Sequence, residues 1–234
     1  MVSPPVVFIP GFMQPAGAWA AVDDLLEPPT TLLDHREHGF EGRLGEIAAA
    51  GEGALLVGYS LGGRLAMRAA LREPRRYAGL VTVGATAGIE QRAARAEADE
   101  RLAAWMEMAP IEDIVAVWER QPLFADQAES LVEAQRPGRL AQDPADLARL
   151  LRTAGQGVLE PVWHELLTFD LPILAIAGAR DEGYVAAAHR IASTAPDARV
   201  EVVEQAGHAP QLQRPAETAA LIAAFRAGLD ERAN

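Results

Sequence analysis

The sequence predicts an α/β protein, in which a mostly parallel sheet is flanked by helices. Short apolar runs alternate with longer segments whose apolar residues recur at helical spacing. The runs show little polar alternation, which is typical of parallel strands buried on both faces. A chain of 234 residues that is 50% hydrophobic is also long enough to bury one sizeable core.

Six apolar runs are the predicted strands. In chain order they are PVVFI at 5–9, TTLLD at 30–34, ALLVGY at 54–59, GLVTVG at 79–84, PILAIAG at 172–178 and RVEVVE at 199–204. The segments 60–72, 185–194 and 215–228 have helical spacing. They supply the crossover helices that parallel strands require.

Residues 86–165 interrupt this alternation. They contain no convincing strand and are rich in Ala, Glu and Arg. We expect several helices, separated at APIED, RPGRL, QDPAD and LEPVW. The prediction is therefore a division into an α/β core of residues 1–85 and 166–234 and a helical cap of residues 86–165.

The composition excludes several classes of function. A net charge of −12 with no visible basic patch argues against nucleic acid or an anionic membrane as partner. The absence of cysteine excludes disulfides and cysteine nucleophiles, and predicts a cytoplasmic protein. The N-terminal run is expected to be a strand rather than a signal peptide, and no segment has the length of a membrane span. The expected partner is a small molecule, whereas the oligomeric state stays open.

One serine stands where packing needs no hydroxyl. Gly58, Ser60 and Gly62 form a G-x-S-x-G motif at the junction of a predicted strand and helix. A sharp turn there lifts the Ser60 hydroxyl clear of the core, and the following helix points free N–H groups toward developing negative charge. The pattern favours a reactive serine over an ordinary glycine-rich turn.

A reactive serine needs a base and an acid that orients the base. His208 and Asp181 each follow a predicted strand, in the order serine, acid, histidine. Glu182 and Asp170 are alternative acids. The amides of Leu61 and Phe12 are the predicted oxyanion-hole donors. No metal or organic cofactor is expected, because the histidines lack ligand spacing and no glycine-rich phosphate-binding turn is present.

The motifs GYSLGGR, GIEQRAAR, VWERQPLFA and GARDEGYVAAAHRIA identify a resemblance. The chain resembles α/β-hydrolase-fold enzymes along nearly its whole length, starting at the strand that usually comes third. Within that fold it is similar to the 2-succinyl-6-hydroxy-2,4-cyclohexadiene-1-carboxylate synthases of menaquinone biosynthesis. The resemblance implies a lyase whose triad removes a proton from a substrate with several carboxylates, after which pyruvate is eliminated.

The resemblance also implies substrate-binding residues, namely Tyr59, Arg64, Arg92, Arg95 and Trp118. By spacing alone, Arg92 and Arg95 would be solvated helix residues and Trp118 would belong to the interior of the cap. As matches to the family, the arginines would pair with carboxylates, and Tyr59 and Trp118 would line the substrate pocket.

Three departures from the family pattern stand beside these matches. Pro10 replaces a histidine before Gly11 and Phe12, DHREHG keeps only the end of a D-x-P-G-H-G turn, and Gln211 and Gln213 replace a histidine and a glutamate after His208.

Two other functions remain open. In the first, Ser60 is a covalent nucleophile of a carboxylesterase or thioesterase that acts on a small substrate. In the second, the chain is a non-catalytic binding module on the same fold, although the expected signature of a degraded triad is absent.

Overall fold

The structure, a computed structural model, describes residues 3–232 and contains one six-stranded parallel sheet. The strands lie in the order β2-β1-β3-β4-β5-β6. Their bounds are β1 (Val6–Ile9), β2 (Thr30–Leu32), β3 (Leu55–Tyr59), β4 (Gly79–Val83), β5 (Ile173–Gly178) and β6 (Ala198–Val203). Each overlaps a predicted run and every neighbouring pair is parallel, which confirms the α/β prediction.

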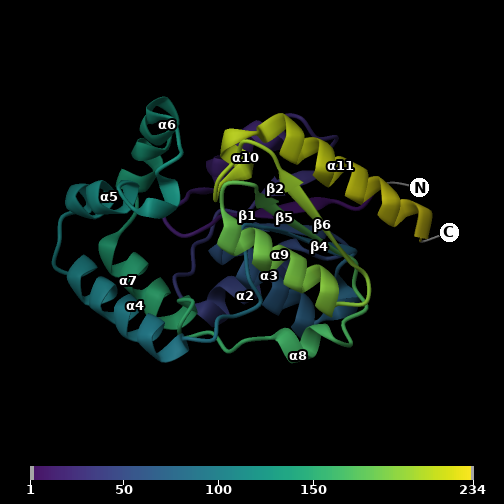
Figure 1. The fold of residues 1–234 in the computed structure, drawn as a ribbon, viewed down its shortest axis with the longest axis horizontal. Helices are drawn as coiled ribbons and strands as arrows, with labels where there is room; N and C mark the ends of the chain where they lie inside the picture. The colour runs from purple at the N-terminus through teal and green to yellow at the C-terminus, as the bar shows by residue number, and fades with distance from the viewer. Residues whose placement is uncertain (1–2, 233–234) are drawn as a thin grey trace.

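Helices cover both faces of the sheet (Figure 1). One face carries α2 (Phe40–Ala50), α3 (Leu61–Arg72), α8 (Trp163–Leu166) and α9 (Glu182–Thr194). The other carries the 3₁₀ turn η1 (Ala16–Trp19), α1 (Ala20–Asp23), α10 (Pro210–Gln213) and α11 (Pro215–Arg232). Alternate strand residues enter the two cores, so that Leu56 packs on the first side and Leu55 on the second.

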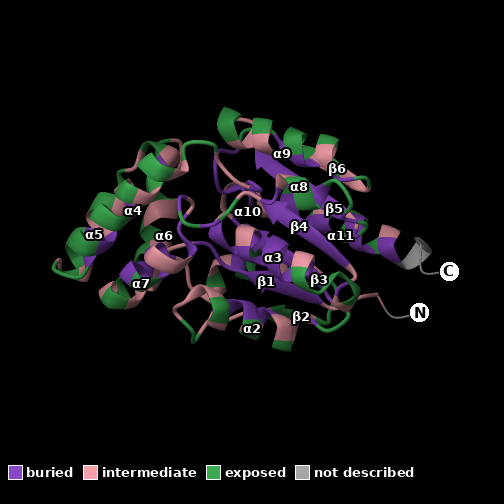
Figure 2. Ribbon diagram, turned by 90° about the horizontal axis from the view of Figure 1, so that it is seen from below, coloured by how far each residue is buried: buried purple, intermediate pink, exposed green. Residues whose placement is uncertain are grey.

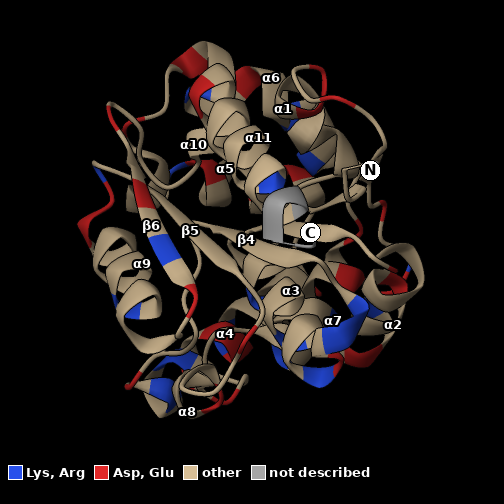
Figure 3. Cartoon of the chain, turned by 90° about the vertical axis from the view of Figure 1, so that its right-hand side faces the viewer, with Lys and Arg blue, Asp and Glu red and all other residues tan. Residues whose placement is uncertain are grey.

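The two edge strands differ from the prediction of strands buried on both faces. The residues of β2, and all of β6 except its last residue, are half-buried or exposed, because each of these strands has a neighbour on one side only. Figure 2 shows the central strands as buried. Figure 3 shows that β4 and β5 carry no charged residue, whereas β6 does.

The described residues between β4 and β5 form no strand, and most are helical. They contain α4 (Arg92–Met106), α5 (Ile111–Glu119), the 3₁₀ turn η3 (Pro122–Phe124), α6 (Glu129–Leu140) and α7 (Pro144–Ala154), followed by α8. Figure 1 places α4 to α7 together beyond one end of the sheet. Met106, Ile114, Leu147 and Leu151 form a separate apolar cluster there, which Met13 of the core joins.

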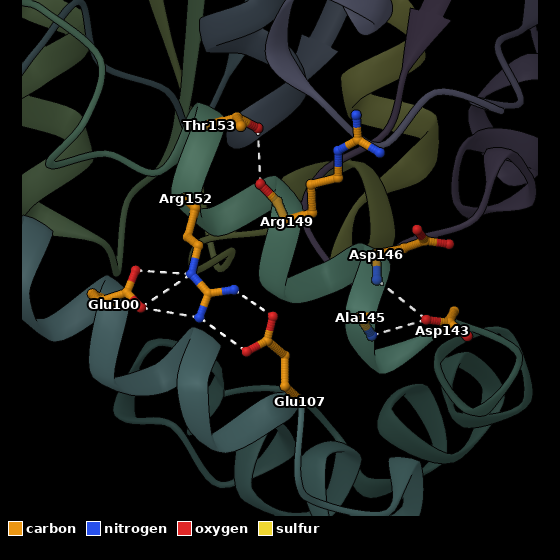
Figure 4. Close-up of polar contacts among 8 residues, drawn as sticks. All are labelled: Glu100, Glu107, Asp143, Ala145, Asp146, Arg149, Arg152 and Thr153. Carbon is orange, nitrogen blue, oxygen red and sulfur yellow. Dashed lines mark hydrogen bonds and ion pairs between the residues drawn. The ribbon is translucent and has the colours of Figure 1, made fainter.

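Polar contacts also hold α4 and α7 together (Figure 4). Arg152 of α7 pairs with Glu100 of α4 at 2.9 Å and with Glu107, which follows α4. Asp143 caps the start of α7 by accepting hydrogen bonds from the amides of Ala145 at 2.8 Å and Asp146 at 3.2 Å.

One predicted helix boundary is wrong. RPGRL does not separate two helices, because Pro137 lies inside α6. Pro137 and Glu133, whose carbonyl would accept from residue 137, are both exposed, so water can satisfy that carbonyl. None of the helices in residues 3–232 is long and apolar enough to cross a membrane.

Candidate active site

The turn between β3 and α3 presents Ser60 in a strained conformation. Ser60 has φ 49° and ψ −109°, which side-chain-bearing residues rarely adopt. The turn is possible only with glycine on both sides. A Cβ on Gly58 would lie 2.4 Å from the Gly62 carbonyl oxygen, and a Cβ on Gly62 would lie 2.3 Å from the Ile9 carbonyl oxygen. The two glycines of the motif are therefore required by backbone packing.

The structure brings Ser60, His208 and Asp181 together. His208 Nε2 lies 3.2 Å from Ser60 Oγ, and His208 Nδ1 lies 2.7 Å from Asp181 Oδ2. Asp181 stands at the start of α9, where its other carboxylate oxygen accepts from the Tyr184 amide at 3.4 Å. The alternative acids Glu182 and Asp170 are both exposed. The His208 side chain is only 1% exposed, so its ring is held in one place by packing and two polar contacts.

Two backbone amides near Ser60 have no acceptor among residues 3–232. They belong to Leu61, at the start of α3, and to Phe12, in the loop after β1. Gln14 makes two hydrogen bonds to Gly11 in this loop. The side-chain oxygen of Gln14 accepts from the backbone N–H of Gly11 at 3.4 Å, and the backbone N–H of Gln14 donates to the Gly11 carbonyl at 3.3 Å. These two N–H groups are therefore available to an anion.

One cavity reaches Ser60, and eight of the ten predicted site residues line it. They are Phe12, Tyr59, Ser60, Leu61, Arg64, Arg95, Trp118 and His208. Asp181 lies behind His208. Residues of the β4–β5 insertion complete the cavity, so the insertion covers the Ser60 end of the sheet.

Arg64 is the arginine of this cavity that lacks a carboxylate partner among the described residues. Its guanidinium donates to the Ala154 carbonyl at 3.2 Å and forms no ion pair. Burial lowers the pKa of Arg64 to about 10, which leaves it cationic at neutral pH. Arg95, by contrast, pairs with Asp99 at 2.7 Å and donates to Gln156 at 2.9 Å. A carboxylate that enters the cavity therefore has Arg64 available.

Arg92 does not line the cavity. Its guanidinium pairs with Glu160 at 2.6 Å and donates to the Val158 carbonyl at 3.2 Å. The spacing of three residues puts Arg92 and Arg95 on one side of α4, but Arg92 is the first residue of α4 and reaches the segment that leads into α8.

Aromatic rings surround His208 and the cavity. The ring centres of Tyr59 and Tyr184 lie 5.3 Å and 4.4 Å from that of His208. The ring of Trp118 lies 5.1 Å from Phe12 and 5.6 Å from Phe124. Burial raises the pKa of Tyr59 well above its usual value, so its hydroxyl stays protonated and can donate.

Several lining residues were not singled out from the sequence, and Phe124, Arg139 and Tyr184 are three of them. Tyr184 follows Asp181 by three residues, a spacing that places both on one side of α9 and could have identified it. Arg139 had no such signal, because its buried ion pair at 3.1 Å is with Glu119 of another helix. Residues 3–232 contain no group of three or more acidic or histidine side chains placed to hold a metal ion.

Known proteins are similar to this chain along most of its length. The sequence profile of the alpha/beta hydrolase family matches residues 6–221. A Bacillus subtilis (strain 168) protein is 35% identical over 166 residues, which is 68% of this chain and only 61% of that relative. A protein of Enterobacter sp. (strain 638), named 2-succinyl-6-hydroxy-2,4-cyclohexadiene-1-carboxylate synthase, is 30% identical over 94% of this chain and 90% of its own length. The structure of MenH from S. aureus has a TM-score of 0.87 and 25% identity, and the match covers 98% of this chain and 96% of that one.

Proposed function

The chain belongs to the alpha/beta hydrolase family, and from this premise we propose that it is a lyase like the 2-succinyl-6-hydroxy-2,4-cyclohexadiene-1-carboxylate synthases. Its substrate is a small molecule with several carboxylates. In this proposal Ser60, His208 and Asp181 form the catalytic triad, and the reaction is proton removal followed by loss of pyruvate.

The observation that carries the proposal is the position of Arg64. Its guanidinium lines the same cavity as Ser60 and has a carbonyl as its only partner among the described residues. A cation without a counter-ion beside a reactive hydroxyl favours an anionic substrate over a neutral ester. An overall acidic protein can in this way bind a polyanion locally.

Proton transfer follows the line of the three side chains. Asp181 holds the Nδ1–H of His208, which leaves Nε2 free to accept a proton from Ser60 as Ser60 takes one from the substrate carbon. The electron pair left on carbon moves into the neighbouring carbonyl, and the Phe12 and Leu61 amides stabilise the resulting oxyanion. The pair then expels the enolpyruvyl oxygen as an enolate, which takes up at carbon the proton that His208 received and becomes pyruvate.

Residues 86–165 act as the cap in this proposal. They supply Arg95 and Trp118 to the cavity that holds the substrate. The predicted role of Arg92 would require its guanidinium to leave Glu160. A cytoplasmic location also stays a prediction, which the lack of cysteine supports.

A serine hydrolase is the second candidate. The 3.2 Å contact between Ser60 and His208, with two free amides nearby, equally suits an acyl-enzyme on a small ester or thioester. In that case Ser60 forms a bond to the acyl carbon, and water later releases the acid.

Pyruvate release separates the two candidates. The purified protein is given the cyclohexene carboxylate that bears succinyl and enolpyruvyl groups, and pyruvate is followed through lactate dehydrogenase and NADH absorbance, with Ser60→Ala as the blank. We expect turnover of about 1 per second or more in the wild type and none above background in the blank. Absence of pyruvate, with hydrolysis of esters or thioesters by the same preparation, would overturn the lyase proposal.

A further inference from the structure

Asp126 of the β4–β5 insertion touches the two loops that carry Asp181 and His208. It lies between η3 and α6, and its side chain is only 24% exposed. Its Oδ2 is 4.0 Å from Arg180 Nη1, and a Cβ added to Gly207 would lie 2.3 Å from the same oxygen. Arg180 and Gly207 are the residues directly before Asp181 and His208. One carboxylate therefore contacts both loops immediately beside the reacting groups.

Gln213, the last residue of α10, joins Asp126 to the backbone of the His208 loop. Its Oε1 accepts from the Gly207 amide at 2.8 Å, and its Nε2 donates to Asp126 Oδ2 at 3.0 Å. The Gly207 N–H can only donate and an ionised carboxylate can only accept, so the bridge needs an oxygen on one side and an N–H on the other. A glutamine provides both, whereas an ionised glutamate would place a second negative charge against Asp126.

We propose that Asp126 and Gln213 form a latch that positions His208 for proton transfer only when the insertion lies against the core. Gln213 and Asp126 are positioning residues in this proposal, because they act through the Gly207 backbone and touch neither Ser60 nor the His208 ring. The ring of Phe124, two residues before Asp126, lies 6.3 Å from that of His208, so the same segment also packs against the base. The latch rests on the proposed role of His208 but not on the identity of the substrate.

The test measures the reactivity of Ser60 without the natural substrate. A fluorophosphonate forms a bond from Ser60 Oγ to phosphorus and releases fluoride, while His208 takes the proton, so its rate reports how well His208 activates Ser60. We compare Gln213→Glu, Asp126→Ala and the reciprocal double variant Asp126→Asn/Gln213→Glu with the wild type. In the double variant, the carboxylate now at position 213 still accepts from Gly207, and the amide now at position 126 supplies the missing N–H.

We expect each single variant to react about 10-fold more slowly than the wild type at pH 8, and the double variant to recover to within about three-fold. The Gln213→Glu defect should shrink toward pH 5. Two facing carboxylates share a proton there, and the protonated one can donate. Asp126→Ala should show no such pH dependence.

The control is Gln127→Glu, which adds the same negative charge as Gln213→Glu but at the residue after Asp126. Gln127 accepts a hydrogen bond from Gln135 at 3.2 Å, a role that glutamate keeps, so the rate and its pH profile should not change. Thermal midpoints are measured for every variant.

Unchanged reactivity in both single variants overturns the latch, as does failure of the double variant to recover. A wild-type Ser60 that does not react overturns both the latch and the triad. If pyruvate release fails while the reactivity pattern holds, only the proposed substrate is wrong.

Discussion

Arg64 differs from the other cationic groups of the cavity in what it binds. Arg95 pairs with Asp99, and Arg139 pairs with Glu119, which also binds Arg136. Arg64 has only the Ala154 carbonyl among the described residues. A charge-assisted hydrogen bond to a neutral acceptor leaves most of the field of the guanidinium directed into the cavity. Arg64 should therefore contribute more to binding an anionic substrate than its neighbours do.

Replacement of Arg64 by Met should raise KM for the carboxylate-bearing substrate by about 10- to 100-fold, the cost of one charge-assisted contact of roughly 1.5–3 kcal/mol. Initial rates over a range of substrate concentrations measure the effect. Arg72→Met is the matched control, because Arg72 lies on the same helix but is exposed and pairs with Glu41. An Arg64→Met enzyme with the KM of the wild type would show that Arg64 does not hold substrate.

The three residues of the proposed triad could be grouped from sequence because each follows a strand. Ser60, Asp181 and His208 stand where strands of a parallel sheet end, and the sheet brings these ends together. Asp126, Arg139 and Gln156 were not predictable in this way. They come from the helical insertion, whose packing on the core depends on contacts between distant side chains rather than on a local pattern.

At the level of elements, the turn from β3 into α3 depends on two glycines that make close backbone contacts. Gly62 lies against the carbonyl of Ile9 and Gly58 against that of Gly62, so β1, β3 and α3 meet within a few ångströms. The helix α2 was not among the predicted elements, since Gly42 and Gly45 lower its propensity and blur its pattern. Strands were predicted better than helix boundaries, because buried β-branched runs have few alternative structures.

Substitution of Gly62 by Ala should lower the free energy of unfolding by about 1–3 kcal/mol or more, because backbone cannot move aside as a flexible side chain can. Urea unfolding followed by fluorescence measures the change. Gly45→Ala, inside α2 with no atom within 4 Å of the new Cβ, should instead be neutral or stabilise by about 0.5–1 kcal/mol. Equal urea midpoints for Gly62→Ala and the wild type would contradict the close contact between Gly62 and the Ile9 carbonyl.

For the molecule as a whole, His35 makes the free energy of unfolding depend on pH. Burial and the nearby Arg43 lower the pKa of His35 from 6.5 to about 4, although its Nδ1 lies 2.7 Å from Glu46. The unfolded chain thus binds a proton below pH 6.5 that the folded chain does not bind until about pH 4. The free energy of unfolding should fall across this window as pH decreases.

His35 lowers the free energy of unfolding by at most about 3 kcal/mol between pH 6.5 and pH 4. His35→Gln, which keeps an amide donor for Glu46 but does not titrate, should lose less stability than the wild type between pH 7 and pH 4.5 in urea titrations. His189→Gln, at an exposed position of α9, should behave like the wild type. If the free energy of unfolding depends on pH in the same way for His35→Gln and the wild type, His35 does not cause the loss of stability in acid.

The position of the insertion has a consequence for synthesis of the chain. Ser60 is 148 residues before His208, and all the helices from α4 to α8 lie between them. A ribosome therefore completes the serine turn long before it makes Asp181 and His208, which come with β5, β6 and their loops. A truncated product that ends anywhere in the insertion carries the serine turn but lacks the other two members of the proposed triad.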